Sequence, residues 1–235
     1  MLRQLRQLLW IERLFVAVIG VTIALILAGP FVVPATLDSP RWVGSTLGDV
    51  VMQLALAAVA FAGPWSFRRQ QRSIGISAAL GLLFAAVYVG VIVLEFQGVQ
   101  TGVNIVALFV GVAFMAGAAV TYRTRHWLQG LLAAIWSLLI GTALWSVAVL
   151  LINYVTWGSH QQYGFWLADG AVDEFRRGGD HDFNAFLLED IHGALFFHPL
   201  VGIVLGSIGG LVGSSAAQGV VALRRLVGPR VRAQG

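Results

Sequence analysis

The chain contains no cysteine and no lysine, and it has few charged residues of any kind. Without cysteine it can form no disulfide, no thiolate metal site and no cysteine nucleophile. Without lysine it cannot form the Schiff base that a retinal protein needs. All 15 basic residues are arginine, which we attribute mainly to a GC-rich genome. These absences exclude several classes of enzyme and pigment before any motif is considered.

Charge is scarce because apolar residues dominate the chain. Only 11% of the 235 residues are charged, whereas 58% are hydrophobic. A soluble domain carries about 25% charged residues. The apolar residues fall in continuous blocks, and about 20 such residues cross a bilayer as a helix. We therefore expect an all-α, polytopic membrane helix bundle that forms one membrane domain, with the lipid bilayer as its partner and no role in nucleic-acid binding.

Six apolar segments are long enough to be transmembrane spans. They cover approximately residues 14–33, 48–67, 73–95, 101–122, 128–157 and 199–223. Residues 1–13 are basic and amphipathic, which is typical of an interfacial helix or of a flank that orients the first span. A cleaved signal peptide is the alternative for the first span, but its apolar region exceeds the roughly 7–15 residues of a typical signal.

Charge alternates between successive loops. The N-terminus, the turns after the second and fourth spans and the C-terminus together hold twelve arginines and one acid, Glu12. The opposite side holds three arginines and ten acids. Because positive loops stay in the cytoplasm, we expect both termini to be cytoplasmic. The chain would then be a multi-pass protein of a bacterial plasma (inner) membrane.

Residues 158–198 contain the only long polar segment, on the predicted outer side. Toward its end, apolar residues recur on one helical face: Phe183, Phe186, Leu187, Ile191 and Leu195. We expect an outer-face interfacial helix over residues 182–197 that turns into the last span at Pro199, since proline suits a first helical turn. A segment of this length is a candidate lid or docking surface. The alternative is that it only seals the outer end of the bundle.

The last span carries a stripe of small residues, a glycine zipper. Its members are Gly202, Gly206, Gly209, Gly210 and Gly213. In lipid, small residues at four-residue spacing let helix backbones approach closely. The stripe predicts tight packing, either against alanines and glycines of spans 48–67 and 101–122 or against another membrane protein.

Polar residues gather at the outer ends of the spans: Asp49, Gln53, Glu95, Asn104 and Asn153. Asp49 and Gln53 are four residues apart and share a helix face. Ionisable residues inside a membrane are functional candidates by default, so the set predicts an outward-facing polar vestibule that binds a small ligand. The alternative is that polar side chains are tolerated at headgroup depth. No chain of acids crosses the bilayer, which argues against a proton-coupled pump.

A metal site is a weaker candidate. Glu189 and His192 have the Glu-x-x-His spacing of di-iron bundles, and His181 lies between Asp180 and Asp182. A di-iron site needs two such pairs and two further glutamates, and the chain has one pair. We keep His181, Glu189 and His192 as possible ligands, but the sequence implies no cofactor. It also has no phosphate-binding loop with lysine, so we expect no nucleotide hydrolysis.

Three functions remain open. The first is a non-enzymatic accessory or assembly subunit of a larger membrane complex, bound to a membrane protein partner through the glycine stripe or residues 158–198. The second is a small-solute transporter, or a substrate-binding membrane component, that uses the vestibule. The third is an outer-face enzyme that acts through Asp180, His181, Glu189 and His192. We rank the subunit first, because it accounts for the small residues and the shortage of buried charge.

Overall fold

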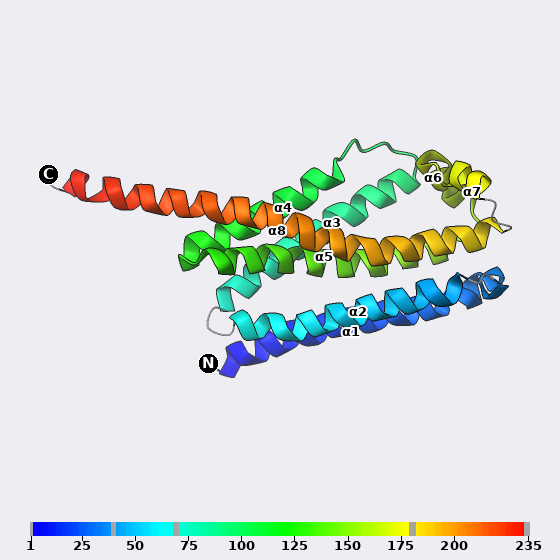
Figure 1. Cartoon of the computed structure of the whole chain (residues 1–235), viewed down its shortest axis with the longest axis horizontal. Helices are drawn as coiled ribbons and strands as arrows, with labels where there is room; N and C mark the ends of the chain where they lie inside the picture. The colour runs from blue at the N-terminus through cyan, green and yellow to red at the C-terminus, as the bar shows by residue number, and fades with distance from the viewer. Residues whose placement is uncertain (1, 39–40, 68–70, 179–181, 233–235) are drawn as a thin grey trace.

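The computed structural model of the chain is built from helices (Figure 1). It describes the backbone of residues 2–38, 41–67, 71–178 and 182–232, and the side chains of residues 13–38, 41–58, 73–178 and 182–224. The predicted amphipathic face of residues 1–12 and the candidate ligand His181 lie outside the described side chains.

The elements follow one another in a simple order. Within the described residues they are α1 (Leu2–Val32), the short 3₁₀ helix η1 (Pro34–Asp38), α2 (Trp42–Phe67), α3 (Gln71–Phe96), α4 (Ile105–Thr124), α5 (Trp127–Val155), α6 (His160–Asp169), α7 (Ala171–Gly178) and α8 (Phe183–Arg232). The all-α prediction is therefore confirmed for this part of the chain.

Five of these helices are long and apolar enough to cross a membrane: α1, α3, α4, α5 and α8. The predicted span 48–67 lies within α2, of which the described apolar part, Trp42–Ala58, is shorter. A multi-pass membrane protein is thus supported by composition and helix length together. The count of six spans and the side on which the termini lie stay predictions.

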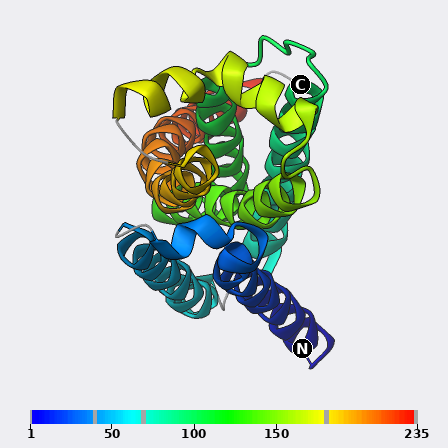
Figure 2. The same cartoon turned by 90° about the vertical axis from the view of Figure 1, so that its right-hand side faces the viewer.

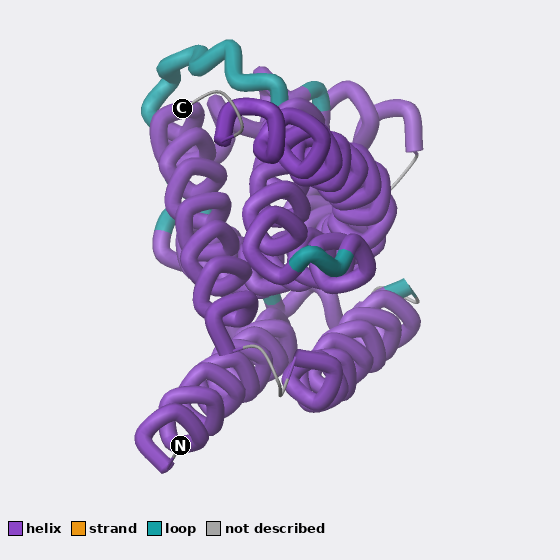
Figure 3. Tube along the Cα trace, turned by 90° about the vertical axis from the view of Figure 1, so that its left-hand side faces the viewer, coloured by secondary structure: helices purple, strands orange, loops and turns teal. Residues whose placement is uncertain are grey.

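Helix α5 is the centre of the bundle. It packs against α1, α3, α4 and α8, and most of its side chains between residues 133 and 150 are buried. Helices α1 and α2 run side by side as a hairpin along one flank, against α5 and α8 (Figure 2). Helices α6 and α7 lie across the end of the bundle opposite to the start of α1 and the end of α8 (Figures 1 and 3). We call the α6–α7 end the outer end and the other the inner end.

The prediction of a separate interfacial helix before the last span is wrong, because residues 183–197 are part of α8. One helix runs from Phe183 through Pro199 to Arg232, with no turn at the proline. The amphipathic pattern is real, but its apolar face packs into the bundle rather than onto a membrane surface. Leu187, Ile191 and Leu195 are at most 3% exposed and belong to the main core. The outer end is covered instead by α6 and α7, which the prediction did not contain.

The glycine stripe explains why α8 lies so close to α5. A Cβ atom added to Gly206 would lie 3.1 Å from the Cα atom of Ile135, and one added to Gly210 would lie 2.6 Å from the Cβ atom of Ala134. Gly202 has more room, because its nearest neighbour, Thr142, would be 3.6 Å away. The α5-facing side of the stripe therefore sets the distance between these two backbones.

The other side of the stripe packs against α4. A Cβ atom on Gly209 would lie 2.7 Å from the carbonyl oxygen of Val110 and 2.8 Å from the Cβ atom of Ala113. A Cβ atom on Gly213 would collide with the carbonyl oxygen of Phe114. Four of the five predicted packing glycines are thus in tight contact with helices of the same chain. The stripe is not open to a separate partner, which leaves residues 158–198 as the remaining predicted contact surface.

Substitution of the stripe should destabilise the bundle. Gly209→Ala and Gly213→Ala place a methyl group against backbone atoms of α4, and overpacking of this kind costs about 1–3 kcal/mol. Gly219→Ala on the same helix is the matched control, because a Cβ atom there meets nothing within 4 Å. Thermal unfolding in detergent, followed by circular dichroism, should show lower midpoints for the first two variants only. Equal midpoints in all three would refute the packing role.

Candidate functional site

The face of α2 that packs against the rest of the bundle carries polar side chains. Thr46, Asp49 and Gln53 are spaced three and four residues apart, so they lie on the same face of the helix. Asp49 is 1% exposed and Gln53 is 0% exposed. Helix α2 packs mainly against α1 and α8. These side chains are therefore withdrawn from solvent, and any partners must come from neighbouring helices.

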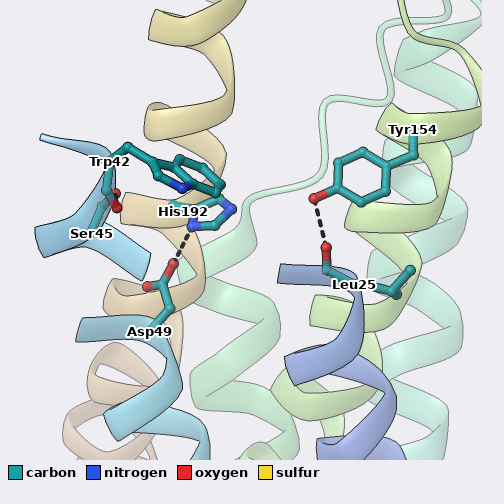
Figure 4. A network of polar contacts seen from close by, with 6 residues as sticks. All are labelled: Leu25, Trp42, Ser45, Asp49, Tyr154 and His192. Atoms are coloured by element: carbon teal, nitrogen blue, oxygen red, sulfur yellow. Dashed lines mark hydrogen bonds and ion pairs between the residues drawn. The ribbon is translucent and has the colours of Figure 1, made fainter. Parts of the chain in front are cut away.

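Helix α8 supplies a partner for Asp49. The His192 side chain is fully buried, and its Nδ1 atom lies 2.7 Å from Oδ2 of Asp49 (Figure 4). The two atoms are within ion-pair distance, so the side chains make a direct polar contact. The ring of Trp42 packs against the imidazole, with 4.7 Å between ring centroids. We call this meeting of α2 and α8 at Asp49, Gln53 and His192 the α2–α8 seam.

A small apolar cluster covers the outer side of the seam. Val33, Trp42 and Leu188 are all buried and pack together, and we call them the outer plug. Helix α1 can come this close because position 29 is glycine. A Cβ atom on Gly29 would lie 2.7 Å from the Trp42 ring and 3.0 Å from Leu188. Leu188 is one helical turn before His192, so the plug separates the pair from the outer solution.

A single hydrogen bond ties the same end of α1 to α5. The hydroxyl group of Tyr154 donates to the backbone carbonyl oxygen of Leu25 at 2.8 Å (Figure 4). Its ring also packs beside the outer plug. The hairpin is thus fixed at its outer end by a hydrogen bond to α5, by apolar contacts, and by the pair between Asp49 and His192.

The seam leaves polar atoms without partners. Among the described residues, neither amide atom of Gln53 has a hydrogen-bond partner, and neither does Nε2 of His192. Leaving such a buried group unsatisfied costs about 1–3 kcal/mol. A carboxylate beside an imidazole can hold a proton and pass it on. The chemistry available at the seam is therefore proton exchange together with hydrogen bonding to a small polar molecule.

The other predicted ligand residues lie elsewhere. Glu95, at the outer end of α3, is half-buried and accepts a hydrogen bond from Thr101 Oγ1 at 3.0 Å. It lines an open groove of about 430 Å³ with Phe165 and Asp169 of α6. Burial, and next the negative charge of Glu174, raise the pKa of Asp169. This groove is separate from the seam.

Asn153 and Asn104 have structural partners. The buried Asn153 amide donates to the Val149 carbonyl oxygen at 2.9 Å, and its Oδ1 atom accepts from Nε2 of Gln162 at 3.2 Å. It thereby anchors α6 to α5. Asn104 is exposed and caps α4 by accepting from the Ala107 backbone N–H. Of the five predicted residues, the structure brings only Asp49 and Gln53 to one place, so it does not assemble a single vestibule.

The metal candidates do not converge in the described part of the chain. His192 contacts Asp49, and the Asp182 carboxylate accepts a hydrogen bond from the Ala185 backbone N–H at 2.9 Å at the start of α8. Within the described residues, no group of three or more histidine, aspartate or glutamate side chains is placed to hold a metal ion. Of the three proposed ligands, His192 is paired with Asp49 and His181 lies outside the described residues, so the structure does not show the proposed three-ligand site.

Sequence reasoning misses the role of His192, although a signal exists. Leu188, His192 and Leu195 are spaced four and three residues apart, so His192 occupies a buried position on the apolar face of α8. A histidine at such a position needs a polar partner, and an acid inside another span is the natural one. The Glu-x-x-His spacing instead directs attention to Glu189.

A second histidine, His198, is half-buried and joins three helices. His198 Nδ1 lies 2.8 Å from the carbonyl oxygen of Ala194, and its Nε2 lies 2.8 Å from the hydroxyl group of Tyr88. Because a carbonyl oxygen only accepts, Nδ1 carries the hydrogen and Nε2 accepts from Tyr88. The imidazole also stacks on Trp145 at 4.1 Å. All the hydrogen-bonding capacity of this ring is used, so it links α3, α5 and α8 rather than forming an open site.

Comparisons with family models, with curated proteins and with solved structures find no match to this chain. The functional argument therefore stands on the geometry of the seam.

Removing both members of the Asp49–His192 pair should cost less stability than the two single substitutions added together. His192→Ala leaves the Asp49 side chain buried without its partner, and breaking a buried pair on one side destabilises a protein by about 3–5 kcal/mol. Asp49→Ala/His192→Ala removes both groups, so its loss should be smaller than the sum of the two single losses by about 1–3 kcal/mol. Chemical unfolding of the four proteins in detergent measures this coupling. Strictly additive losses would show that the two side chains do not interact.

Proposed function

We propose that the chain is a small-solute transporter, or the substrate-binding membrane component of one, that works through the α2–α8 seam. The observation that carries this proposal is the burial of Asp49, Gln53 and His192 within an apolar bundle. Stability alone gives no reason to keep such groups, since replacing a buried ion pair by apolar residues is often neutral or stabilising. Ionisable side chains inside membrane bundles commonly mark substrate and ion pathways.

The arrangement of the hairpin supports a moving part. Helices α1 and α2 form one layer against α5 and α8, and the seam lies between that layer and the rest of the bundle (Figure 2). Substrate sites of membrane transporters lie at the interface of two bodies that rock against each other. A site between α2 and α8 is at such an interface, so movement of the hairpin would expose it.

The proposal includes six spans, cytoplasmic termini and a plasma-membrane location. Its support is that α1 begins and α8 ends at the same end of the bundle (Figure 3), as an even number of spans requires. The turn between α4 and α5, which contains Arg125, lies at that end as well (Figure 1). Helix α7, which contains Asp173 and Glu174, lies at the opposite end.

Reporter fusions test this topology. A reporter active only in the cytoplasm should be active when fused after Gly235 and inactive when inserted within α7. Tandem reporters of the opposite compartment specificity provide the control for expression. Activity of one reporter at both positions would place α7 and the C-terminus on the same side and would refute the six-span topology.

An accessory subunit is the second candidate, favoured by the surface of the outer cap. Tyr163 and Leu167 are four residues apart on α6 and are 49% and 53% exposed. Helix α6 lies outside the candidate spans, so these apolar groups are placed to contact a partner or the lipid headgroups. The glycine stripe no longer supports the accessory-subunit function, because its glycines pack against helices of the same chain.

Solute binding distinguishes the two candidates. We expect that, in a panel of chemically diverse small polar solutes, at least one class raises the unfolding temperature of the detergent-solubilised protein by several degrees. Gln53→Leu should abolish the shift, because it removes both unpartnered amide atoms. Gln218→Leu, at an exposed position of α8, is the matched control and should keep it. Absence of any shift, with a stoichiometric partner retained in mild detergent, would instead support the subunit.

A further inference from the structure

We propose that Asp49 and His192 form a proton-binding site that keeps the α2–α8 seam closed, and that the seam opens toward the outer end when its single proton leaves. The inference deepens the proposed function, on which it rests for its role in transport. It links opening of the seam to the exchange of one proton with the outer solution, which needs no chain of acids across the bilayer. The steps below concern the binding of that proton and need no substrate.

The closed seam holds one proton because any other number leaves a net charge buried. With one proton the pair is either a carboxylate beside an imidazolium or a carboxylic acid beside a neutral imidazole, and both forms are neutral overall. Removing the proton leaves a bare carboxylate, and adding a second leaves a lone imidazolium. Each of these buries an uncompensated ion, which costs several kcal/mol in a protein interior. The 0–1% exposure of His192 and Asp49 makes this constraint apply in full.

Opening the seam removes the constraint because water then reaches both groups. In water an aspartate gives up its proton above about pH 4 and a histidine above about pH 6.5. Above about pH 6.5 the open seam therefore holds no proton, whereas the closed seam holds one. Opening then releases a proton, so each unit of rising pH favours the open form by up to about tenfold. Between about pH 4 and 6.5 both forms hold one proton, and opening is independent of pH.

The packing sets the direction in which the seam opens. On the outer side the pair is covered by the outer plug, one helical turn away. On the inner side α2 continues into a second apolar cluster, where Leu56 packs with Phe15 and Ile19 of α1. Separation at the plug needs only the outer ends of α1 and α2 to move. The outer path is therefore the shorter one.

Other titratable groups belong to the elements that pack around the pair, and the experiment must separate them from it. They are Arg13 on α1, Asp38 on η1, Arg41 on α2, Tyr154 on α5, and Glu189, Asp190 and His198 on α8. All of them persist when position 49 or 192 is changed. A pH dependence that reverses or shifts with those two substitutions therefore belongs to the pair.

The absence of cysteine makes thiol labelling a direct measure of opening. Thr46→Cys places one thiol on the polar face of α2, at a position whose side-chain oxygen is buried. Leu56→Cys reports on the inner side, and Leu37→Cys, at 67% exposure, supplies the reference rate. The protein is labelled in lipid nanodiscs between pH 5 and 8.5 with a polar maleimide. Dividing each rate by that of Leu37→Cys removes the pH dependence of the thiol itself.

Each background has its own expected profile. With Asp49 and His192 present, the normalised rate at position 46 should be flat to about pH 6.5 and then rise up to about tenfold per unit. In Asp49→Asn the closed seam holds a neutral imidazole, so opening takes up a proton and the rate should rise as the pH falls below about 6.5. In His192→Asn the closed seam holds a carboxylic acid, so the rate should rise across the whole range from pH 5. The rate at position 56 should not change.

A flat profile at position 46, or the same profile in Asp49→Asn and the parent, would overturn the proton site. Should Asp49→Asn fail to fold, the His192→Asn profile provides a separate test, because its rate should begin to rise at a lower pH than that of the parent. Failure of the proton site can be distinguished from failure of the proposed transport function. A solute that binds while labelling stays flat refutes only the proton site. A pH-dependent seam with no solute found retains the proton site and refutes only the transport role.

Discussion

Close backbone contact between α8 and its two neighbours, α4 and α5, is the constraint on which the rest of the structure depends. A bilayer offers helices no hydrophobic gain for associating, so contact must come from shape. Gly206, Gly209, Gly210 and Gly213 remove the side chains that would hold the backbones apart. This contact also fixes the rotation of α8 about its own axis. The same helix carries His192 toward its outer end, where Asp49 of α2 meets it.

Two kinds of attachment hold the molecule together. The core of α3, α4, α5 and α8 is joined by extended apolar packing and by the His198 link, which has no unsatisfied nitrogen. The α1–α2 hairpin is joined at its outer end by the plug, by the Tyr154 hydrogen bond and by a pair of titratable groups. In the proposed mechanism, the pair in the second attachment exchanges a proton when the hairpin moves. The structure therefore combines a fixed body with a layer whose docking responds to its surroundings.

Much of this fold can be predicted from the sequence, whereas the site can be predicted only in part. The apolar blocks give the helices, and the spacing of Asp49 and Gln53 places them on one face. The depth of a residue in the membrane can be inferred from its place in a span, but its direction around the helix axis relative to other helices cannot. Glu95, Asn104 and Asn153 therefore share a depth with Asp49 and still lie apart from it. Likewise, an amphipathic pattern cannot show whether the apolar face of α8 meets a bilayer surface or the bundle.

The unbroken course of α8 has a mechanical consequence. Its 50 residues, at 1.5 Å per residue, give a rod of roughly 75 Å, whereas the hydrocarbon layer of a bilayer is about 30 Å thick. In the proposed topology, the same piece of backbone therefore reaches both aqueous compartments. Since a continuous helix resists twisting, a rotation of its outer segment would be transmitted along its axis to its inner end. In that topology a change on the outer side would reach the inner side through this one helix.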